Sequence, residues 1–320
     1  MNIKKILTAV AVAILSCAFV ACGNDRASSD GNKDKKVVIA TTFPAYDWAR
    51  NIAGSSDGIE VRYLVDSNVD LHSYQPSAAD LIEYKEADLV ICIGGESEEW
   101  IEDAGIDESK LLSLINVVDA KEEELVEGME GEEEEEESKE CEEEVEYDEH
   151  IWLSLKNAGV CSDAIEKKFA DIDPKNAQVY ELNLKKYVAD LKALDEKYED
   201  AVSNAKCNTL IFGDRFPFRY LASDYGLNYY AAFVGCSAET EASFETIVFL
   251  ANKVDELKVP AICTIGNRSI AETIAENSRL SSDDIVEFES LQDISNKDSD
   301  ASYLGAMEKN LESLKKALGN

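Results

Sequence analysis

Short, almost continuously apolar runs alternate along the chain with longer stretches of helical character. Four runs lie in each half: VVIATTF (37–43), IEVRYLV (59–65), ADLVICIG (87–94) and LSLINVVDA (112–120), then NTLIFGD (208–214), LNYYAAF (227–233), PAICTIG (260–266) and IVEFESL (285–291). Strands that are apolar at nearly every position are buried on both faces, as in parallel sheets covered by crossover helices. The pattern therefore predicts an α/β protein with one parallel four-stranded sheet in each half.

One long amphipathic stretch, residues 173–205, separates the two halves. Asp173 is placed to cap a helix, and Pro174 suits its first turn. Apolar residues then recur at helical spacing for about eight turns, a length of about 45–50 Å. The stripe is not a strict heptad, so we predict a rigid helix (173–206) that joins two Rossmann-like lobes, 36–172 and 207–320. The chain closes on a second amphipathic helix, SYLGAMEKNLESLKKAL (302–318).

The first residues have the pattern of a lipoprotein signal. Lys4 and Lys5 precede an apolar run and the sequence FVAC, which resembles a lipobox and marks Cys22 for lipidation after cleavage. Residues 22–35 are polar and have the composition of a flexible tether. We therefore expect a signal peptide over residues 1–21 and an extracytoplasmic protein, anchored by its lipid to the bacterial cell membrane.

Composition adds a strong acidic bias and very few histidines. The 320 residues include 66 acidic and 31 basic side chains, giving a net charge of −35, and only two histidines. This charge argues against nucleic acid as a partner, because phosphates require a basic surface. The eight cysteines form no C-x-x-C pair, and their pairing stays open.

Much of the negative charge lies in one segment, residues 121–147, which contains six consecutive glutamates. Such a run repels itself and is expected to be disordered. Two roles remain open for it. It is either a weak, multivalent collector of cations or a solvating loop of no specific function.

Both histidines stand where a loop meets a helix. His72 follows the predicted strand 59–65, and His150 lies between the acidic segment and the helical stretch WLSLKNA. Ligands of open α/β sheets bind at the carboxyl ends of strands, and neutral imidazole is the commonest metal ligand. The two positions are compatible with a shared metal site and also with two unrelated histidines.

Several segments resemble the metal-binding lipoproteins of zinc and manganese ABC importers. They are HSYQPSAADLIEYKEADLV (72–90), YDEHIWLSLKNA (147–158), GDRFPFRYLASDYGL (213–227) and the closing 302–318, in the family's order. The resemblance implies a metal between the lobes, bound by His72 and His150 and delivered to a membrane permease. We expect Zn²⁺ because imidazole favours it, with Mn²⁺ as the alternative. We also expect a monomer without enzyme activity.

The sequence departs from the family's pattern at the remaining ligands. Arg215 stands where the family has a histidine or glutamate, and a guanidinium cannot bind a cation. Asp214 is the candidate third ligand, with a helix cap or an arginine partner as its alternative role. Asp293 is the candidate fourth ligand. Further options are Glu289, Gln292, Glu239 and Glu241. One of these glutamates is also expected to neutralise Arg215.

Two other function classes compete with metal capture for an importer. A zinc hydrolase needs an open metal position and a general base, but the chain has no H-E-x-x-H motif and no nucleophile elbow. Only Glu149, beside His150, would mimic such a base. An adhesin-like surface lipoprotein on the same scaffold, with a degenerate or altered ligand site, stays open because the third ligand is missing.

Overall fold

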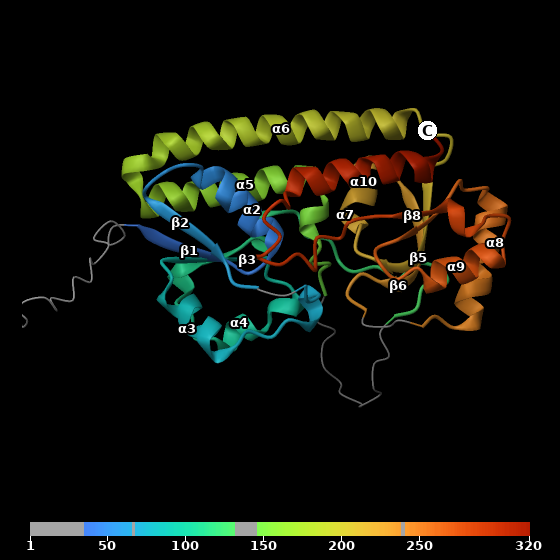
Figure 1. Ribbon diagram of the computed structural model, residues 1–320, viewed down its shortest axis with the longest axis horizontal. Coiled ribbons are helices and arrows are strands. Elements are labelled where there is room, and N and C mark those ends of the chain that lie inside the picture. Colours follow the sequence, from blue (N-terminus) through green and yellow to red (C-terminus); the bar gives the residue numbers. More distant parts are fainter. Residues whose placement is uncertain (1–34, 66–67, 132–145, 238–240) are drawn as a thin grey trace, which may run out of the picture. The chain divides into compact units, whose positions relative to one another are not determined.

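All eight predicted strands are present in the computed structural model of the protein, where they form two parallel four-stranded sheets (Figure 1). The first sheet has the order β2-β1-β3-β4 and the second β6-β5-β7-β8, so both follow one topology. The strands are β1 (Lys36–Ala40), β2 (Ile59–Tyr63), β3 (Leu89–Cys92), β4 (Leu111–Ser113), β5 (Thr209–Phe216), β6 (Asn228–Val234), β7 (Ile262–Thr264) and β8 (Ile285–Glu287). The predicted α/β class is confirmed.

Helices connect the strands and cover both faces of each sheet. They are α2 (Phe43–Ala53), α3 (Ala78–Glu86), α4 (Trp100–Asp103), α5 (Leu155–Ile172), α6 (Ala177–Ser203), α7 (Arg219–Tyr225), α8 (Phe244–Leu257), α9 (Ser269–Glu276) and α10 (Tyr303–Leu318). Successive residues of a strand point to opposite faces. In β1, Val38 joins the core beneath α2 and α5, whereas Ile39 packs with Tyr84 of α3. This two-sided burial explains why the strands read as continuous apolar runs.

Helix α6 is the predicted joining helix, and it lies along α2, α5 and α10 (Figure 1). Its start differs from the prediction. Pro174 opens a 3₁₀ turn (Pro174–Asn176), and the α-helix begins only at Ala177. Asp173 makes no side-chain cap. Its carboxylate accepts hydrogen bonds from the Tyr180 hydroxyl (2.6 Å) and the Asn176 amide (2.7 Å) instead. The 27 residues of α6 give a helix of about 40 Å, shorter than expected.

One hydrophobic core runs between the two sheets. It contains Val38 of the first sheet, Phe212 of the second, Leu191 of α6 and Leu314 of α10. Two smaller cores lie on the outer faces, one under α3 and one under α8 and α9. Each sheet therefore buries one face in a core of its own and the other in a core that both share.

The structure describes residues 35–65, 68–131, 146–237 and 241–320. The predicted signal peptide, Cys22, the tether up to residue 34 and the central part of the acidic segment (132–145) lie outside these residues. The division into lobes 36–172 and 207–320 stays a prediction. Within the described ranges, no helix combines the length and the apolar character needed to cross a bilayer.

Candidate metal site

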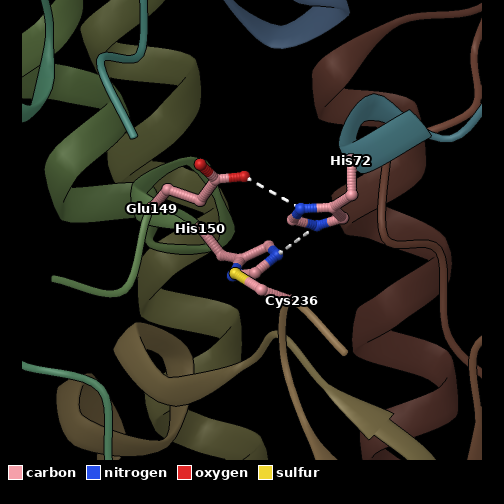
Figure 2. A group of neighbouring side chains, drawn as sticks. All are labelled: His72, Glu149, His150 and Cys236. Carbon is pink, nitrogen blue, oxygen red and sulfur yellow. Dashed lines mark hydrogen bonds and ion pairs between the residues drawn. The ribbon is translucent and has the colours of Figure 1, made fainter. Parts of the chain in front are cut away.

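The two histidines meet, although 77 positions separate them in the chain. His72 lies in a 3₁₀ turn (Leu71–Ser73) after β2, and the Asp70 carboxylate accepts the backbone N–H of His72 at the start of that turn. His150 immediately precedes another 3₁₀ turn (Ile151–Leu153), which leads into α5. Their Nε2 atoms are 3.3 Å apart (Figure 2). The His150 side chain is fully buried and that of His72 is 12% exposed.

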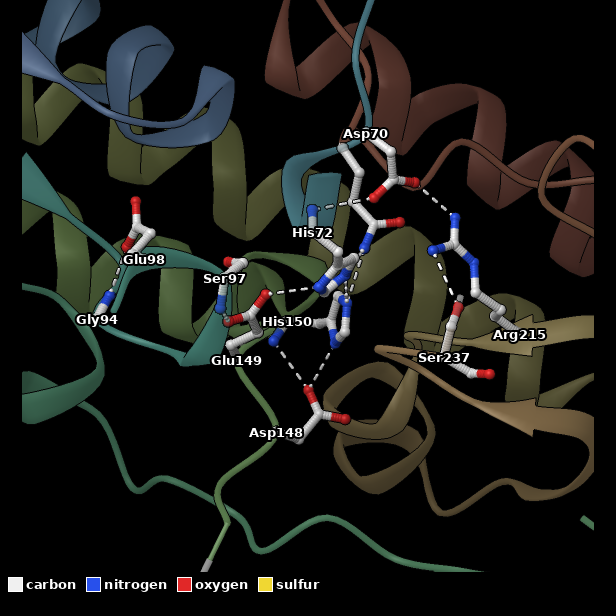
Figure 3. A network of polar contacts seen from close by, with 11 residues as sticks. Asp70, His72, Gly94, Ser97, Glu98, Asp148, Glu149, His150, Arg215 and Ser237 are labelled. Atoms are coloured by element: carbon white, nitrogen blue, oxygen red, sulfur yellow. Dashed lines mark hydrogen bonds and ion pairs between the residues drawn. The ribbon is translucent and has the colours of Figure 1, made fainter. Parts of the chain in front are cut away.

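Carboxylates determine which ring nitrogens carry protons. Asp148 Oδ1 accepts the backbone N–H of His150 (2.8 Å) and lies 3.0 Å from its Nδ1 (Figure 3). Glu149 Oε1 lies 3.3 Å from Nδ1 of His72. A proton on each Nδ1 leaves both Nε2 lone pairs facing each other, the tautomer that metal-ligating histidines adopt.

Gln292 lies against both imidazoles. Its amide nitrogen is 2.8 Å from Nε2 of His72 and 2.8 Å from Nε2 of His150, and can donate one N–H to each lone pair. Its Oε1 is buried and has no hydrogen-bond partner. The two lone pairs thus converge on one shared hydrogen-bond donor, a place that suits a positive charge.

Glu149 and Cys236 complete the cluster. One donor atom from each of His72, Glu149, His150 and Cys236 lies within 4.8 Å of the other three (Figure 2). Glu149 is buried, and its Oε2 accepts the backbone N–H of Ser97 at 3.0 Å. Gly95 permits this close approach, because a Cβ there would lie 2.1 Å from Oε2. Imidazole nitrogen, carboxylate oxygen and cysteine sulfur are all donor atoms that bind zinc.

Burial and charge set the protonation of the cluster. Burial, together with the neighbouring His150, lowers the pKa of His72 to about 3, so this ring is neutral at physiological pH. Burial also disfavours the charged form of His150, but the nearby carboxylates of Asp148, Glu149 and Glu123 together raise the pKa of His150. Burial raises the pKa of the Cys236 thiol, and the charge of Glu149 raises it further. At physiological pH no proton therefore occupies the Nε2 lone pair of His72.

Asp214 and Asp293, the other two predicted ligands, are not brought into the cluster. Both line a cavity of about 570 Å³ that also borders His72. Asp214 Oδ2 accepts hydrogen bonds from the Thr264 hydroxyl (2.8 Å) and the Ile265 N–H (3.0 Å), while Oδ1 accepts the N–H of Arg215. Its oxygens thus hold strand ends together. Asp293 is exposed and follows Gln292, which takes the place beside the histidines.

Arg215 is neutralised by a residue that the sequence did not indicate. Its Nη2 lies 2.6 Å from Asp70 Oδ2, and its Nη1 donates to the Ser237 carbonyl at 3.4 Å (Figure 3). Glu241 and Glu289, two of the expected glutamate partners, do not make this contact, and Glu239, the third, lies outside the described residues. Because Asp70 also caps the turn of His72, Arg215 helps to hold that histidine in place.

The sequence profile of the family described as "Zinc-uptake complex component A periplasmic" matches residues 38–317. The chain belongs to this family. The predicted resemblance is therefore confirmed. The family consists of solute-binding proteins of metal ABC transporters and not of enzymes. It gives no support to the hydrolase alternative.

Two curated relatives show how far the likeness extends. The zinc-binding lipoprotein AdcA of Streptococcus pneumoniae serotype 4 is 28% identical over 323 residues, which cover 98% of this chain and 60% of the relative. The chain thus spans only about 60% of the length of that protein. The high-affinity zinc uptake system protein ZnuA of Bacillus subtilis is 30% identical over 302 residues and 93% of each chain.

Solved structures show the same fold. The metal-dependent lipoprotein YcdH from Bacillus subtilis superposes with a TM-score of 0.72 at 25% identity, over 89% of this chain and 99% of that one. The two-lobed α/β architecture predicted from the sequence is confirmed by this neighbour together with the sheet topology.

Sequence reasoning missed part of the cluster. Glu149 draws attention only as the base of a hydrolase, and Cys236 belongs to no motif. A signal for Glu149 exists in the triplet Asp-Glu-His (148–150), which places two carboxylates beside a candidate ligand. Cys236 has a weaker signal, its place just after the carboxyl end of β6, where ligand-binding residues of parallel sheets gather.

Proposed function

We propose that the chain is the solute-binding lipoprotein of an ABC importer, and that it captures a divalent metal ion at His72 and His150. The observation that carries this proposal is the 3.3 Å separation of their Nε2 atoms. Two nitrogens bound to one zinc ion at about 2.0–2.1 Å, with tetrahedral angles, are about 3.3–3.4 Å apart. The pair fits zinc without rearrangement of either ring.

The neighbouring residues support capture in distinct ways. Asp148 holds the His150 ring by its Nδ1 proton, and Glu149 adds a buried carboxylate whose Oε1 lies 3.3 Å from Nδ1 of His72. Gln292 donates to the same lone pairs that the ion needs. Its amide must therefore turn or withdraw as the ion arrives. The ion itself supplies the positive charge that this acidic, buried cluster lacks.

Zinc is proposed over manganese because of the donor types. Imidazole binds Zn²⁺ more strongly than Mn²⁺, which prefers oxygen ligands. Relatives in this family are named for either metal: the Bacillus subtilis protein for zinc and one from Streptococcus mitis for manganese. Two histidines with one carboxylate support a preference of this chain for zinc.

We further propose extracytoplasmic anchoring through Cys22 and delivery of the ion to a membrane permease. The naming of relatives as lipoproteins of metal ABC transporters supports both points. The shared core opposes wide opening of the lobes, so entry and release are proposed to use local movement of the His72 turn and the Gln292 segment. A monomeric state and the adhesin-like alternative stay predictions.

Calorimetric titration of the purified protein with Zn²⁺ and with Mn²⁺ tests the proposal. We expect one zinc ion per chain and weaker binding of manganese. A matched variant that lacks residues 132–145 should keep this site, because the cluster contains none of them. Absence of stoichiometric binding, or binding that disappears with the acidic segment, would show that the histidine cluster is not the metal site.

Replacing Asp148 with asparagine should weaken zinc binding about 10–100-fold, the usual cost of losing the partner that orients a histidine ligand. The amide can no longer hold the Nδ1 proton of His150 with a negative charge. Competition with a chromophoric chelator measures the change. Asp300→Asn, at an exposed position, is the matched control and should bind as the wild type does. Equal affinity of both variants would rule out an orienting role for Asp148.

A further inference from the structure

Cys236 lies where a fourth metal donor is needed. It follows β6 in a short turn, and its Sγ is within 4.8 Å of donor atoms of His72, Glu149 and His150. Figure 2 shows the sulfur beside the His150 ring. The turn packs directly on that ring, since a Cβ at Gly235 would lie 2.8 Å from His150 Cε1. The thiol is thus held at the cluster by the backbone that carries it.

The two residues at the family's third-ligand position, Asp214 and Arg215, are engaged elsewhere. Arg215 cannot bind a cation and is paired with Asp70. Both oxygens of Asp214 accept hydrogen bonds from strand ends. Among the residues that the structure describes, the cluster with Cys236 is the one group of three or more cysteine, histidine and carboxylate side chains close enough to hold an ion. Zinc normally requires four filled positions in a closed site.

We propose that Cys236 binds the captured ion as a thiolate, so that the site takes thiophilic divalent ions such as Zn²⁺, Co²⁺ and Cd²⁺ in preference to Mn²⁺. This inference rests on the proposed function and deepens it. As the sulfur–metal bond forms, the S–H bond breaks and the proton leaves to water. No electron is transferred. Soft thiolate ligands select zinc and disfavour manganese, which prefers oxygen donors.

Charge and burial agree with this role. The thiolate and the Glu149 carboxylate together carry two negative charges. These balance the two positive charges of a divalent ion bound in a buried place.

Titration of the purified protein with Co²⁺, followed by absorption spectroscopy, tests the inference. Cobalt occupies zinc sites, and its visible bands report binding, whereas a thiolate ligand adds a sulfur-to-metal charge-transfer band in the near ultraviolet. We expect that band in the wild type at one ion per chain. It should persist in Cys207→Ser, a control at another partly exposed cysteine, and disappear in Cys236→Ser while the visible bands remain. The ratio of zinc to manganese affinity should also fall in Cys236→Ser.

The outcomes separate the two proposals. Cobalt bound at one ion per chain without the charge-transfer band in the wild type overturns the role of Cys236 and leaves the proposed function intact. No binding of cobalt or zinc overturns both. A band that survives in Cys236→Ser assigns the sulfur to another residue and also overturns the inference. If Cys236→Ser does not fold, protection of Cys236 from alkylation by bound zinc in the wild type, read by mass spectrometry, decides the question.

Discussion

Replacing His150 with alanine should remove tight zinc binding, with a loss of affinity well beyond the roughly 10–100-fold that an outer-shell partner contributes. His150 supplies one of the two nitrogens that lie 3.3 Å apart, and its ring is fully buried. A water molecule in place of the imidazole is a weaker base, and the ion would keep one protein ligand fewer. Chelator competition measures the affinity directly.

A thermal assay gives a second reading of the same variant. Saturating zinc at about 100 times its Kd stabilises a binding protein by about 2.7 kcal/mol, and the variant should show almost none of that shift. Tyr147→Ala is the matched control. This residue lies in the same segment but is 51% exposed, and its variant should keep both affinity and shift. Wild-type affinity in His150→Ala would mean that zinc binds elsewhere.

Replacing Trp152 with alanine should destabilise the metal-free protein by about 3–5 kcal/mol, as large-to-small changes in well-packed cores do. The indole is buried, and its Nε1 donates to the Ser290 carbonyl at 2.8 Å. The Trp152 carbonyl accepts the Tyr303 hydroxyl at 2.6 Å. The ring therefore connects the segment of His150 to the segment that carries Gln292, and its loss leaves a cavity beside the histidines.

Urea denaturation of wild type, Trp152→Ala and Trp152→Phe measures this effect. The phenylalanine variant keeps most of the volume and leaves one carbonyl without its donor, so it should lose only about 1–3 kcal/mol. Both variants should unfold with an unchanged dependence on urea concentration. A change below about 1 kcal/mol in Trp152→Ala would contradict tight packing at this position.

The strands and their parallel arrangement could be predicted because burial on both faces leaves nearly continuous apolar runs in the sequence. The predicted strands differ from the observed ones in their lengths. The run 112–120 yields a strand of three residues, Leu111–Ser113, and then a 3₁₀ turn, Ile115–Val117. Apolar residues in a turn serve the core as well as those in a strand. Composition alone cannot separate the two.

The site is harder to predict because its atoms come from loops. The meeting of His72 and His150 follows from their positions after a strand and before a helix, together with the resemblance to metal-binding lipoproteins. Glu149 and Cys236 depend on how two turns fold back toward the rings. A one-residue change in such a turn exchanges Gln292 for Asp293. No periodicity in the sequence reports that choice.

The core shared by both sheets has a thermodynamic consequence. Two halves of similar topology suggest two independent domains, each with its own stability. Here one core joins residues of both sheets with residues of α6 and α10. Separation of the halves would expose part of this core to water, a cost that grows with the apolar area uncovered. We therefore expect the two halves to unfold together, so that an ion bound at the cluster stabilises both at once.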